Sequence, residues 1–179
     1  MTPPDPALIS RLRALVRDIP DFPKPGILFR DITPLLADAR ALRDATAQMC
    51  LPFAQAQVDK VLGVESRGFI FATLAAHHLG AGFVPVRKAG KLPAERISES
   101  YSLEYGEDRL EVHLDAVRQG EKVLIVDDLL ATGGTAAATI ALARRLGAQV
   151  LACVFLIELS DLGGRGRLEG VDVLSLIRY

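Results

Sequence analysis

Two adjacent carboxylates and a loop of small residues lie past the middle of the chain. Residues 123–126 read Val-Leu-Ile-Val, Asp127 and Asp128 follow them, and residues 131–135 read Ala-Thr-Gly-Gly-Thr. The apolar run predicts a short buried strand, and the alanine-rich residues 136–146 predict a helix. A strand, a loop and a helix in this order direct backbone N–H groups toward one point beyond the sheet, where the helix N-terminus favours a phosphate.

The loop and the two acids suit different parts of a ligand. The loop begins at Ala131. Its glycines, Gly133 and Gly134, let the backbone approach a ligand closely and adopt positive φ, and Thr132 and Thr135 supply hydroxyl donors. The carboxylates cannot hold a phosphate, because like charges repel, so they suit neutral hydroxyls or a metal bound by the ligand. An ordinary glycine turn with solvated acids is the competing interpretation, and it fits either dipeptide alone better than the whole run.

Two common nucleotide-binding motifs do not describe this loop. The sequence contains no Gly-x-x-x-x-Gly-Lys-Ser/Thr, so the loop is not of the Walker A type. Residues 164–166 read Gly-Arg-Gly, but they match the dinucleotide fingerprint poorly, and no long apolar helix follows them. A dehydrogenase-like nucleotide binder is therefore disfavoured.

A second strand is expected to deliver one arginine to the same edge of the sheet. Residues 58–64 predict this strand, and Ser66 and Arg67 lie in the turn Glu-Ser-Arg-Gly that follows it. A guanidinium fork suits a diphosphate. For this tetrapeptide alone, an arginine that caps a surface turn is the competing interpretation.

Three further cations follow the next predicted strand, residues 82–86. Arg87, Lys88 and Lys91 occur where the carboxyl end of this strand should meet the same pocket. A run of charges is usually a solvated face, but in this place the cations predict contact with a diphosphate, whose charge they can balance.

Strands and helices alternate through most of the chain, which predicts an α/β fold with a doubly wound, mostly parallel sheet flanked by helices. Residues 89–104 carry glycine, proline, serine and charged residues, and we expect them to form a mobile excursion, in the form of a two-stranded flap. The predicted strands are residues 27–32, 58–64, 82–86, 110–114, 122–126, 149–159 and 171–177, and the predicted helices are residues 6–19 (with Asp5 as N-cap), 39–50, 69–79 and 136–146.

Composition narrows the class of protein. The 179 residues suit one domain with a sizeable core, and half of them are hydrophobic, which argues against disorder. A formal net charge of −1 argues against nucleic acid or an anionic membrane surface as the main partner. Cys50 and Cys153 fit buried free thiols in a reducing compartment. No apolar run of about 18 residues occurs, so we expect a soluble, cytoplasmic chain.

The run from Asp127 to Thr135 resembles the motif with which type I phosphoribosyltransferases bind phosphoribosyl diphosphate (PRPP). The resemblance implies that the two acids contact the ribose 2′- and 3′-hydroxyls and that residues 131–135 wrap the 5′-phosphate. It also implies that Ser66 and Arg67 belong to the loop that binds the leaving diphosphate. Residues 1–179 would then form a single domain with the type I phosphoribosyltransferase fold.

Residues 21–34 and 100–106 resemble, in particular, the branch of this family that uses adenine. The resemblance assigns residues 1–35 to an N-terminal helix and a base-binding hood. In this hood Leu28 and Phe29 are candidates for stacking on adenine, and backbone groups near Arg30 read its Watson–Crick edge. Core packing is the competing interpretation for Leu28.

The same resemblance assigns residues 89–106 to a catalytic flap. Within it, Glu104 is similar to the family's acid/base residue near adenine N7, and Tyr105 orders the flap over the diphosphate. A solvated surface charge is the competing interpretation for Glu104.

The implied reaction converts adenine and PRPP to AMP and diphosphate, a step of purine salvage. The resemblance implies Mg²⁺ as cofactor, held mainly by PRPP and water rather than by protein ligands. It also implies a homodimer, with Arg87 near the subunit boundary. The alternatives are an enzyme for another purine, such as hypoxanthine or xanthine, and a PRPP-sensing regulator on the same fold. The neutral, apolar hood argues against orotate.

Overall fold

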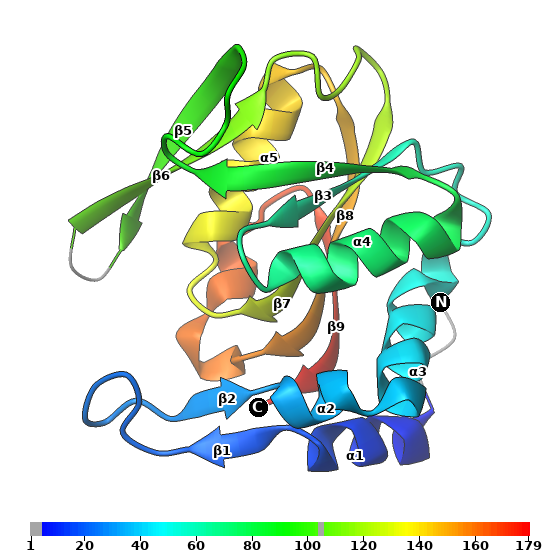
Figure 1. Cartoon of the computed structure of the whole chain (residues 1–179), viewed down its shortest axis with the longest axis vertical. Helices are drawn as coiled ribbons and strands as arrows, with labels where there is room; N and C mark the ends of the chain where they lie inside the picture. The colour runs from blue at the N-terminus through cyan, green and yellow to red at the C-terminus, as the bar shows by residue number, and fades with distance from the viewer. Residues whose placement is uncertain (1–4, 104–105) are drawn as a thin grey trace.

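The chain folds around a central sheet (Figure 1). The computed structural model describes residues 5–103 and 106–179. Within these residues seven strands form this sheet, in the order β5-β6-β4-β3-β7-β8-β9. The pairings β4-β3-β7-β8-β9 are parallel, and β6 joins β4 and β5 antiparallel. The predicted α/β fold with a mostly parallel sheet is confirmed. The strands are β3 (Lys60–Val64), β4 (Gly82–Lys88), β5 (Arg96–Leu103), β6 (Gly106–His113), β7 (Lys122–Leu130), β8 (Gln149–Glu158) and β9 (Asp172–Arg178).

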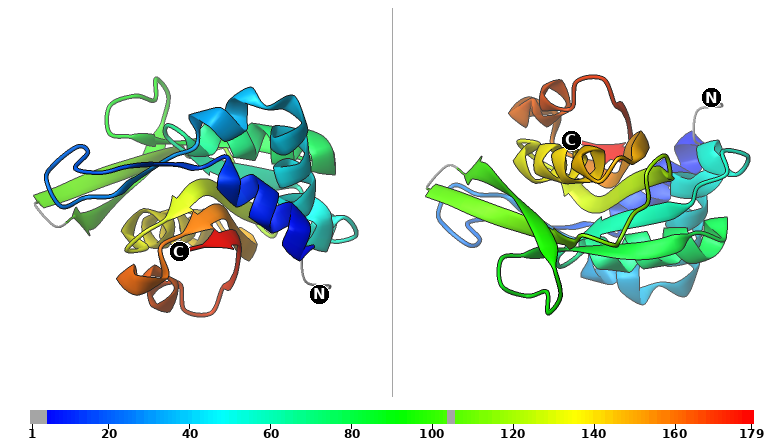
Figure 2. Two further views of the ribbon diagram at one scale, coloured as in Figure 1. Left: turned by 90° about the horizontal axis from the view of Figure 1, so that it is seen from below. Right: turned by 90° about the horizontal axis from the view of Figure 1, so that it is seen from above.

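Helices cover both faces of the sheet (Figure 2). The helix α4 (Gly68–Leu79) packs against β3 and β7 on one face and against α3 (Ala39–Cys50), while α5 (Gly134–Arg145) lies on the other face. Two apolar clusters result, and the side chains of β7 alternate between them: Leu124 is buried in the first and Ile125 in the second. Because both faces are covered, the central strands read as nearly continuous apolar runs.

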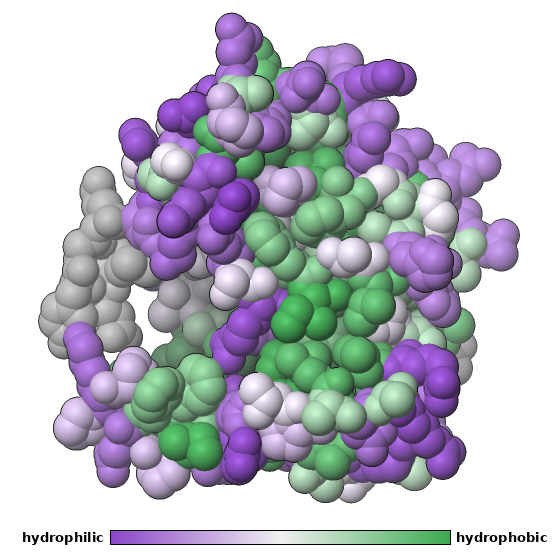
Figure 3. All heavy atoms as spheres, in the orientation of Figure 1, coloured by the Kyte–Doolittle hydropathy of each residue, from purple (hydrophilic) through white to green (hydrophobic). Residues whose placement is uncertain are grey.

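Hydrophobic side chains gather in the middle of the face that carries α4, with hydrophilic residues around them (Figure 3). Ile70 of α4 is 37% exposed. The two cysteines, Cys50 and Cys153, are buried and free, as predicted, and burial raises the pKa of their thiols to about 11 and about 12. In the part of the chain that the structure describes, none of the helices has the length and apolar character needed to span a membrane.

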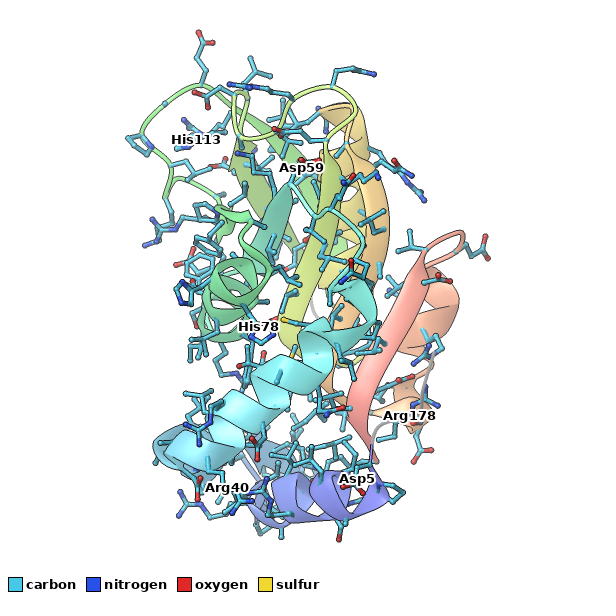
Figure 4. The ribbon with its side chains drawn as sticks, turned by 90° about the vertical axis from the view of Figure 1, so that its right-hand side faces the viewer. Asp5, Arg40, Asp59, His78, His113 and Arg178 are labelled. Carbon is cyan, nitrogen blue, oxygen red and sulfur yellow. The ribbon has the colours of Figure 1, made fainter. Side chains whose placement is uncertain are left out.

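A separate N-terminal unit packs at the carboxyl end of the sheet. It begins with α1 (Pro6–Ala14), and Asp5, labelled in Figure 4, accepts a hydrogen bond from the Ala7 backbone N–H at 2.9 Å, as the N-cap prediction requires. The unit continues with β1 (Arg17–Ile19), β2 (Phe29–Asp31) and α2 (Thr33–Ala37). The strands β1 and β2 pair antiparallel and form a small sheet of their own.

The prediction that the first helix extends to Ile19 is wrong, because α1 ends at Ala14. Residues 17–19 pair instead with residues 29–31, and the Arg17 side chain binds Asp31 with an Nη2–Oδ2 distance of 2.7 Å. Val16 is still buried beyond the end of the helix, so the apolar spacing did not reveal where the helix stops.

The prediction that the motif strand ends at residue 126 is also wrong. The strand β7 continues to Leu130, because it pairs with β8 over this length, with Asp127 opposite Phe155 and Leu130 opposite Glu158. The two carboxylates are therefore held within a strand instead of just after its end, which fixes where their side chains can point.

The strands β5 and β6 form a long antiparallel hairpin, with Arg96 opposite His113. The strand expected at residues 110–114 is thus the end of a longer one. Residues 89–95 form the loop before the hairpin. The side chain of Glu111, which is 3% exposed, anchors this loop to β6. Its Oε2 accepts a hydrogen bond from the Gly90 backbone N–H at 2.9 Å and lies 3.0 Å from Nε of Arg96.

Three short 3₁₀ turns complete the described part of the chain: η1 (Leu51–Phe53), η2 (Ser160–Leu162) and η3 (Gly164–Arg167). The turn η3 lies within residues 163–170, which the sequence predicts to be a loop before the last strand.

Candidate functional site

A cavity of about 480 Å³ opens at the carboxyl ends of β3 and β7. This edge of an open α/β sheet is where such folds bind ligands. The lining residues come from the five strands β3, β4, β5, β7 and β8, from the loops that follow β3 and β7, and from the first turn of α5. They are Val64, Glu65, Ser66, Arg67, Lys88, Tyr101, Asp127, Asp128, Leu129, Leu130, Ala131, Thr132, Gly133, Gly134, Thr135, Ala136 and Phe155.

The two carboxylates form the acidic part of the cavity wall. Oδ1 of Asp127 accepts a hydrogen bond from the Asp128 backbone N–H at 2.8 Å, and Oδ2 of Asp128 lies 2.8 Å from Nε of Arg67. Burial raises the pKa of both carboxyl groups, and the charge of Asp128 raises that of Asp127 further, while Arg67 opposes the shift. The free site therefore holds two carboxylates whose charge is costly until hydroxyl donors or a cation bind them.

Replacing Asp127 with asparagine is expected to stabilise the free protein at neutral pH. Folding raises the pKa of Asp127, so the stability that its protonated form contributes is present below the unfolded pKa and is lost as pH rises through the folded pKa. Asparagine stays neutral and does not lose it. Thermal unfolding of both proteins between pH 4 and 8 should show a gap in Tm that widens with pH, by about 2–4 °C for each kcal/mol relieved. A gap that stays constant over this range would contradict the raised pKa.

The 131–135 loop leads directly into a helix. Gly133 is the N-cap residue of α5, with φ +82°, a left-handed conformation that favours glycine. Because α5 begins at Gly134, the first backbone N–H groups of the helix lie beside the cavity and lack intrahelical partners. Such a helix N-terminus stabilises a phosphate.

Arg67 joins three parts of the site. It is the N-cap residue of α4, and its guanidinium pairs with Asp128 and lies over the Phe29 ring of the N-terminal unit, with Cζ 5.1 Å from the ring centroid. Gly68 follows it, and a Cβ atom at Gly68 would lie 2.5 Å from Oδ1 of Asp127. The glycine thus allows the first turn of α4 to sit against the acidic pair, a role that the sequence reasoning did not foresee.

The three predicted cations are placed differently from one another. The prediction that the strand before them ends at residue 86 is wrong, because Arg87 and Lys88 are the last two residues of β4. Lys88 lines the cavity, and its Nζ lies 3.5 Å from Oδ2 of Asp108. Arg87 instead binds Glu65 through Nε and Nη2, at 3.2 and 3.1 Å, and its Nη1 donates to the Lys91 carbonyl at 3.0 Å. The Arg87 guanidinium holds the pKa of Glu65 below its ordinary value. Neither Arg87 nor Lys91 is among the residues that line the cavity, so their contact with diphosphate stays a prediction.

Tyr101 of β5 also lines the cavity, although sequence reasoning did not name it as a site residue. Its hydroxyl donates a hydrogen bond to Oδ2 of Asp108 at 3.1 Å, and burial raises its pKa. It lies in residues 100–106, the segment that carried the second resemblance, and this was the only signal that could have pointed to it.

The predicted base-binding residues lie in and beside β2. Phe29 packs edge-to-face on Phe22 with ring centroids 5.1 Å apart, and Leu28 is 46% exposed, which argues against core packing for Leu28. Arg30 binds Asp18, and its Cζ lies 3.7 Å above the ring of Tyr179, the last residue of the chain. Tyr179 therefore packs against the N-terminal unit, which the sequence pattern did not indicate.

Glu104 and Tyr105, the predicted flap residues, lie outside the residues that the structure describes. Their roles stay predictions. The described strands on either side of them, β5 and β6, carry Tyr101 and Asp108 beside Lys88 at the cavity.

Comparison with known proteins shows the family to which this chain belongs. The family described as phosphoribosyl transferase domain matches residues 31–173. The adenine phosphoribosyltransferase of Methylococcus capsulatus is 60% identical over 171 residues, which cover 96% of this chain and 100% of the relative.

Solved structures give the same result. The adenine phosphoribosyltransferase of Rhodothermus marinus is 50% identical with a TM-score of 0.94, and the match covers 98% of this chain and 100% of that one. The Saccharomyces cerevisiae enzyme, complexed with D-2,5-dideoxy-2,5-imino-altritol 1,6-bisphosphate and adenine, is 39% identical with a TM-score of 0.90, covering 95% and 98%. By sequence and by fold, this chain belongs to the phosphoribosyltransferase family and, within it, to the adenine phosphoribosyltransferases.

Proposed function

We propose that this chain transfers the 5-phosphoribosyl group of PRPP to adenine, giving AMP and diphosphate, and that the cavity at the ends of β3 and β7 is where it does so. The observation that carries the proposal is the juxtaposition of Arg67, the Asp127–Asp128 pair and the N-terminus of α5 around one cavity. The yeast relative, whose structure contains adenine and a bisphosphate, supports the choice of substrates.

PRPP binds with its phosphate and its ribose on different parts of β7 and the loop after it. The 5′-phosphate accepts hydrogen bonds from backbone N–H groups of the 131–135 loop and from the hydroxyls of Thr132 and Thr135. Asp127 and Asp128 accept hydrogen bonds from the ribose 2′- and 3′-hydroxyls. These donors compensate the burial of the two carboxylates, so ligand binding relieves a cost present in the free site.

The leaving diphosphate lies near Arg67 and Lys88. The bond from ribose C1 to the diphosphate oxygen breaks, a bond from C1 to the adenine nitrogen forms, and the electron pair of the broken bond stays on the diphosphate. Cations fixed before the reaction stabilise the negative charge that develops there. Arg87 and Lys91 contribute to the same positive field, with Arg87 held in place by Glu65.

Adenine lies against the hood formed by residues 1–35. Phe29, with Leu28 exposed beside it, offers an apolar surface to the ring, and backbone groups near Arg30 read its polar edge. Residues 89–106 close over the site and exclude water, which would otherwise capture an oxocarbenium-like ribose. Glu104 accepts the proton that adenine N7 loses when the bond from C1 to the adenine nitrogen forms.

Mg²⁺ fits this site as an ion bound by the substrate. Among the described residues no group of three or more His, Cys, Asp or Glu side chains is arranged to hold a metal, and Mg²⁺ commonly uses substrate phosphates, water and one or two carboxylates. When bound, it neutralises charge on the diphosphate. Three carboxylates line the cavity, and Glu65 among them is bound by Arg87, so Asp127 and Asp128 are the protein groups that suit that role.

The test is nucleotide formation from PRPP and Mg²⁺ with adenine, hypoxanthine, guanine, xanthine and orotate in parallel. We expect AMP from adenine and turnover with the other bases lower by at least about a hundredfold, because each mismatched polar edge leaves buried groups unpaired. Turnover of another base at a comparable rate would overturn the assignment of the hood. PRPP binding without turnover of any base would instead favour a PRPP-sensing regulator.

A further inference from the structure

The Gly-Arg-Gly segment at residues 164–166, which the sequence reasoning set aside, touches the 131–135 loop backbone to backbone. A Cβ atom at Gly164 would lie 2.1 Å from the Ala131 carbonyl oxygen and 2.9 Å from the Gly133 nitrogen. A Cβ atom at Gly133 would lie 2.4 Å from the Gly164 carbonyl oxygen. No side chain fits between the two segments at these points, so the η3 turn sets how far the 131–135 loop can move away from the ligand.

A buried charge anchors this turn to the sheet. Arg165, the residue after Gly164, donates to both carboxylate oxygens of Glu158, through Nε at 3.0 Å and Nη2 at 2.6 Å. Its Nη1 donates to the Val173 carbonyl on β9 at 2.7 Å. Glu158 is 5% exposed and also lies 3.4 Å from Nε of Arg178, which Figure 4 labels on β9. A bidentate pair to a buried carboxylate fixes both position and orientation.

The anchor and the loop are also linked through the sheet. Glu158 lies opposite Leu130 in the parallel pairing of β7 and β8, and Leu130 precedes the first residue of the loop. The Leu159 backbone N–H donates to the Leu130 carbonyl at 2.9 Å. The start of the 131–135 loop and the turn behind it are therefore both fixed to β8, and none of the anchoring residues Glu158, Arg165 and Val173 lines the cavity.

We propose that the η3 turn positions the 131–135 loop for the phosphate of PRPP, with Gly164 as the contact and Arg165 as the anchor. Both are positioning residues: they act on the ligand only through the loop. The inference rests on the proposed function, because it takes PRPP as the ligand of this loop. It adds a determinant of PRPP affinity that lies about thirty residues beyond the motif itself.

The chain offers a matched pair of substitutions in one turn. Gly164→Ala places a methyl group against backbone atoms, whereas Gly166→Ala places it where no atom lies within 4 Å. Neither glycine has a positive φ, so only the close approach distinguishes them. We expect Gly164→Ala to raise the KM for PRPP by about tenfold to a hundredfold, since displacements of about 1 Å at a site have effects of this size. The KM for adenine should stay within about twofold, and Gly166→Ala should match the wild type.

Arg165→Gln is a second test variant, and it introduces no steric clash with the 131–135 loop. It should raise the KM for PRPP and leave that for adenine unchanged, and calorimetric titration with PRPP and Mg²⁺ should show the same loss of affinity. A fall in Tm with unchanged PRPP affinity in both Gly164→Ala and Arg165→Gln would reduce the turn to a merely structural element and overturn the inference. If the wild type binds PRPP but makes no AMP, the proposed function fails, and the titrations still decide whether the turn positions the loop.

Discussion

Replacing both Asp127 and Asp128 with alanine is expected to weaken PRPP binding by about a hundredfold or more. In the proposed complex each carboxylate accepts a charge-assisted hydrogen bond from a ribose hydroxyl, and such bonds contribute about 1.5–3 kcal/mol each. The double variant should nevertheless fold, because burial raises the pKa of both acids, and the charge of Asp128 raises that of Asp127 further, so their charges are costly in the free protein. Isothermal titration with PRPP and Mg²⁺, with Tm recorded alongside, measures both effects.

Asp59 supplies the matched control for this experiment. Its Oδ2 accepts a hydrogen bond from the Lys122 backbone N–H at 2.7 Å, at the opposite end of β7 from the cavity. Asp59→Ala removes a carboxylate from the same sheet, so PRPP affinity should remain that of the wild type. Unaltered PRPP affinity in the Asp127/Asp128 double variant would remove the ribose assignment.

Arg67→Ala is expected to lower kcat/KM for PRPP by about a hundredfold to a thousandfold. This range is typical when one fixed donor to developing negative charge is removed. The guanidinium contacts both Asp128 and the Phe29 ring beside the proposed diphosphate position, so its loss affects charge and geometry together. Steady-state kinetics with PRPP varied at saturating adenine gives the ratio directly.

Arg67→Lys separates charge from geometry. Lysine retains the positive charge but lacks the planar fork, so we expect an intermediate rate, well below that of the wild type. The pKa of Asp128 should also rise further in Arg67→Ala, because the cation that lowers it is gone. Wild-type kcat/KM in Arg67→Ala would exclude the arginine from the reaction.

The parts of the fold that could be predicted from sequence are those with local signals. The helix predicted at residues 39–50 has these bounds in the structure, because Asp38 caps its start and Pro52 follows its end. The order of strand, loop and helix around Asp127 could also be predicted from the sequence. By contrast, β1 and the extension of β7 to Leu130 arise from pairing with distant strands, which no local pattern encodes.

The candidate site shows the same division. Residue types and spacing placed Arg67 and the acidic pair at one edge of the sheet, but not the ion pair between Arg67 and Asp128. The sequence identifies Arg87 as one of the cations near the site. It does not predict the ion pair with Glu65, because that pair depends on how β3 and β4 lie side by side. Tyr179 contacts Arg30, and Gly164 contacts Gly133. Both contacts join segments that lie far apart in sequence, so only the folded chain reveals them.

The most direct test of the account is a crystal structure of the protein with adenine, Mg²⁺ and a carbocyclic analogue of PRPP. The analogue has a ring carbon in place of the ribose oxygen, so it cannot form an oxocarbenium-like state and should remain intact. The account predicts the 5′-phosphate on the 131–135 loop, the ring hydroxyls on Asp127 and Asp128, the diphosphate beside Arg67 and Lys88, and adenine against Phe29. A phosphate bound elsewhere, or a base outside the hood with the carboxylates free of hydroxyl contacts, would contradict it.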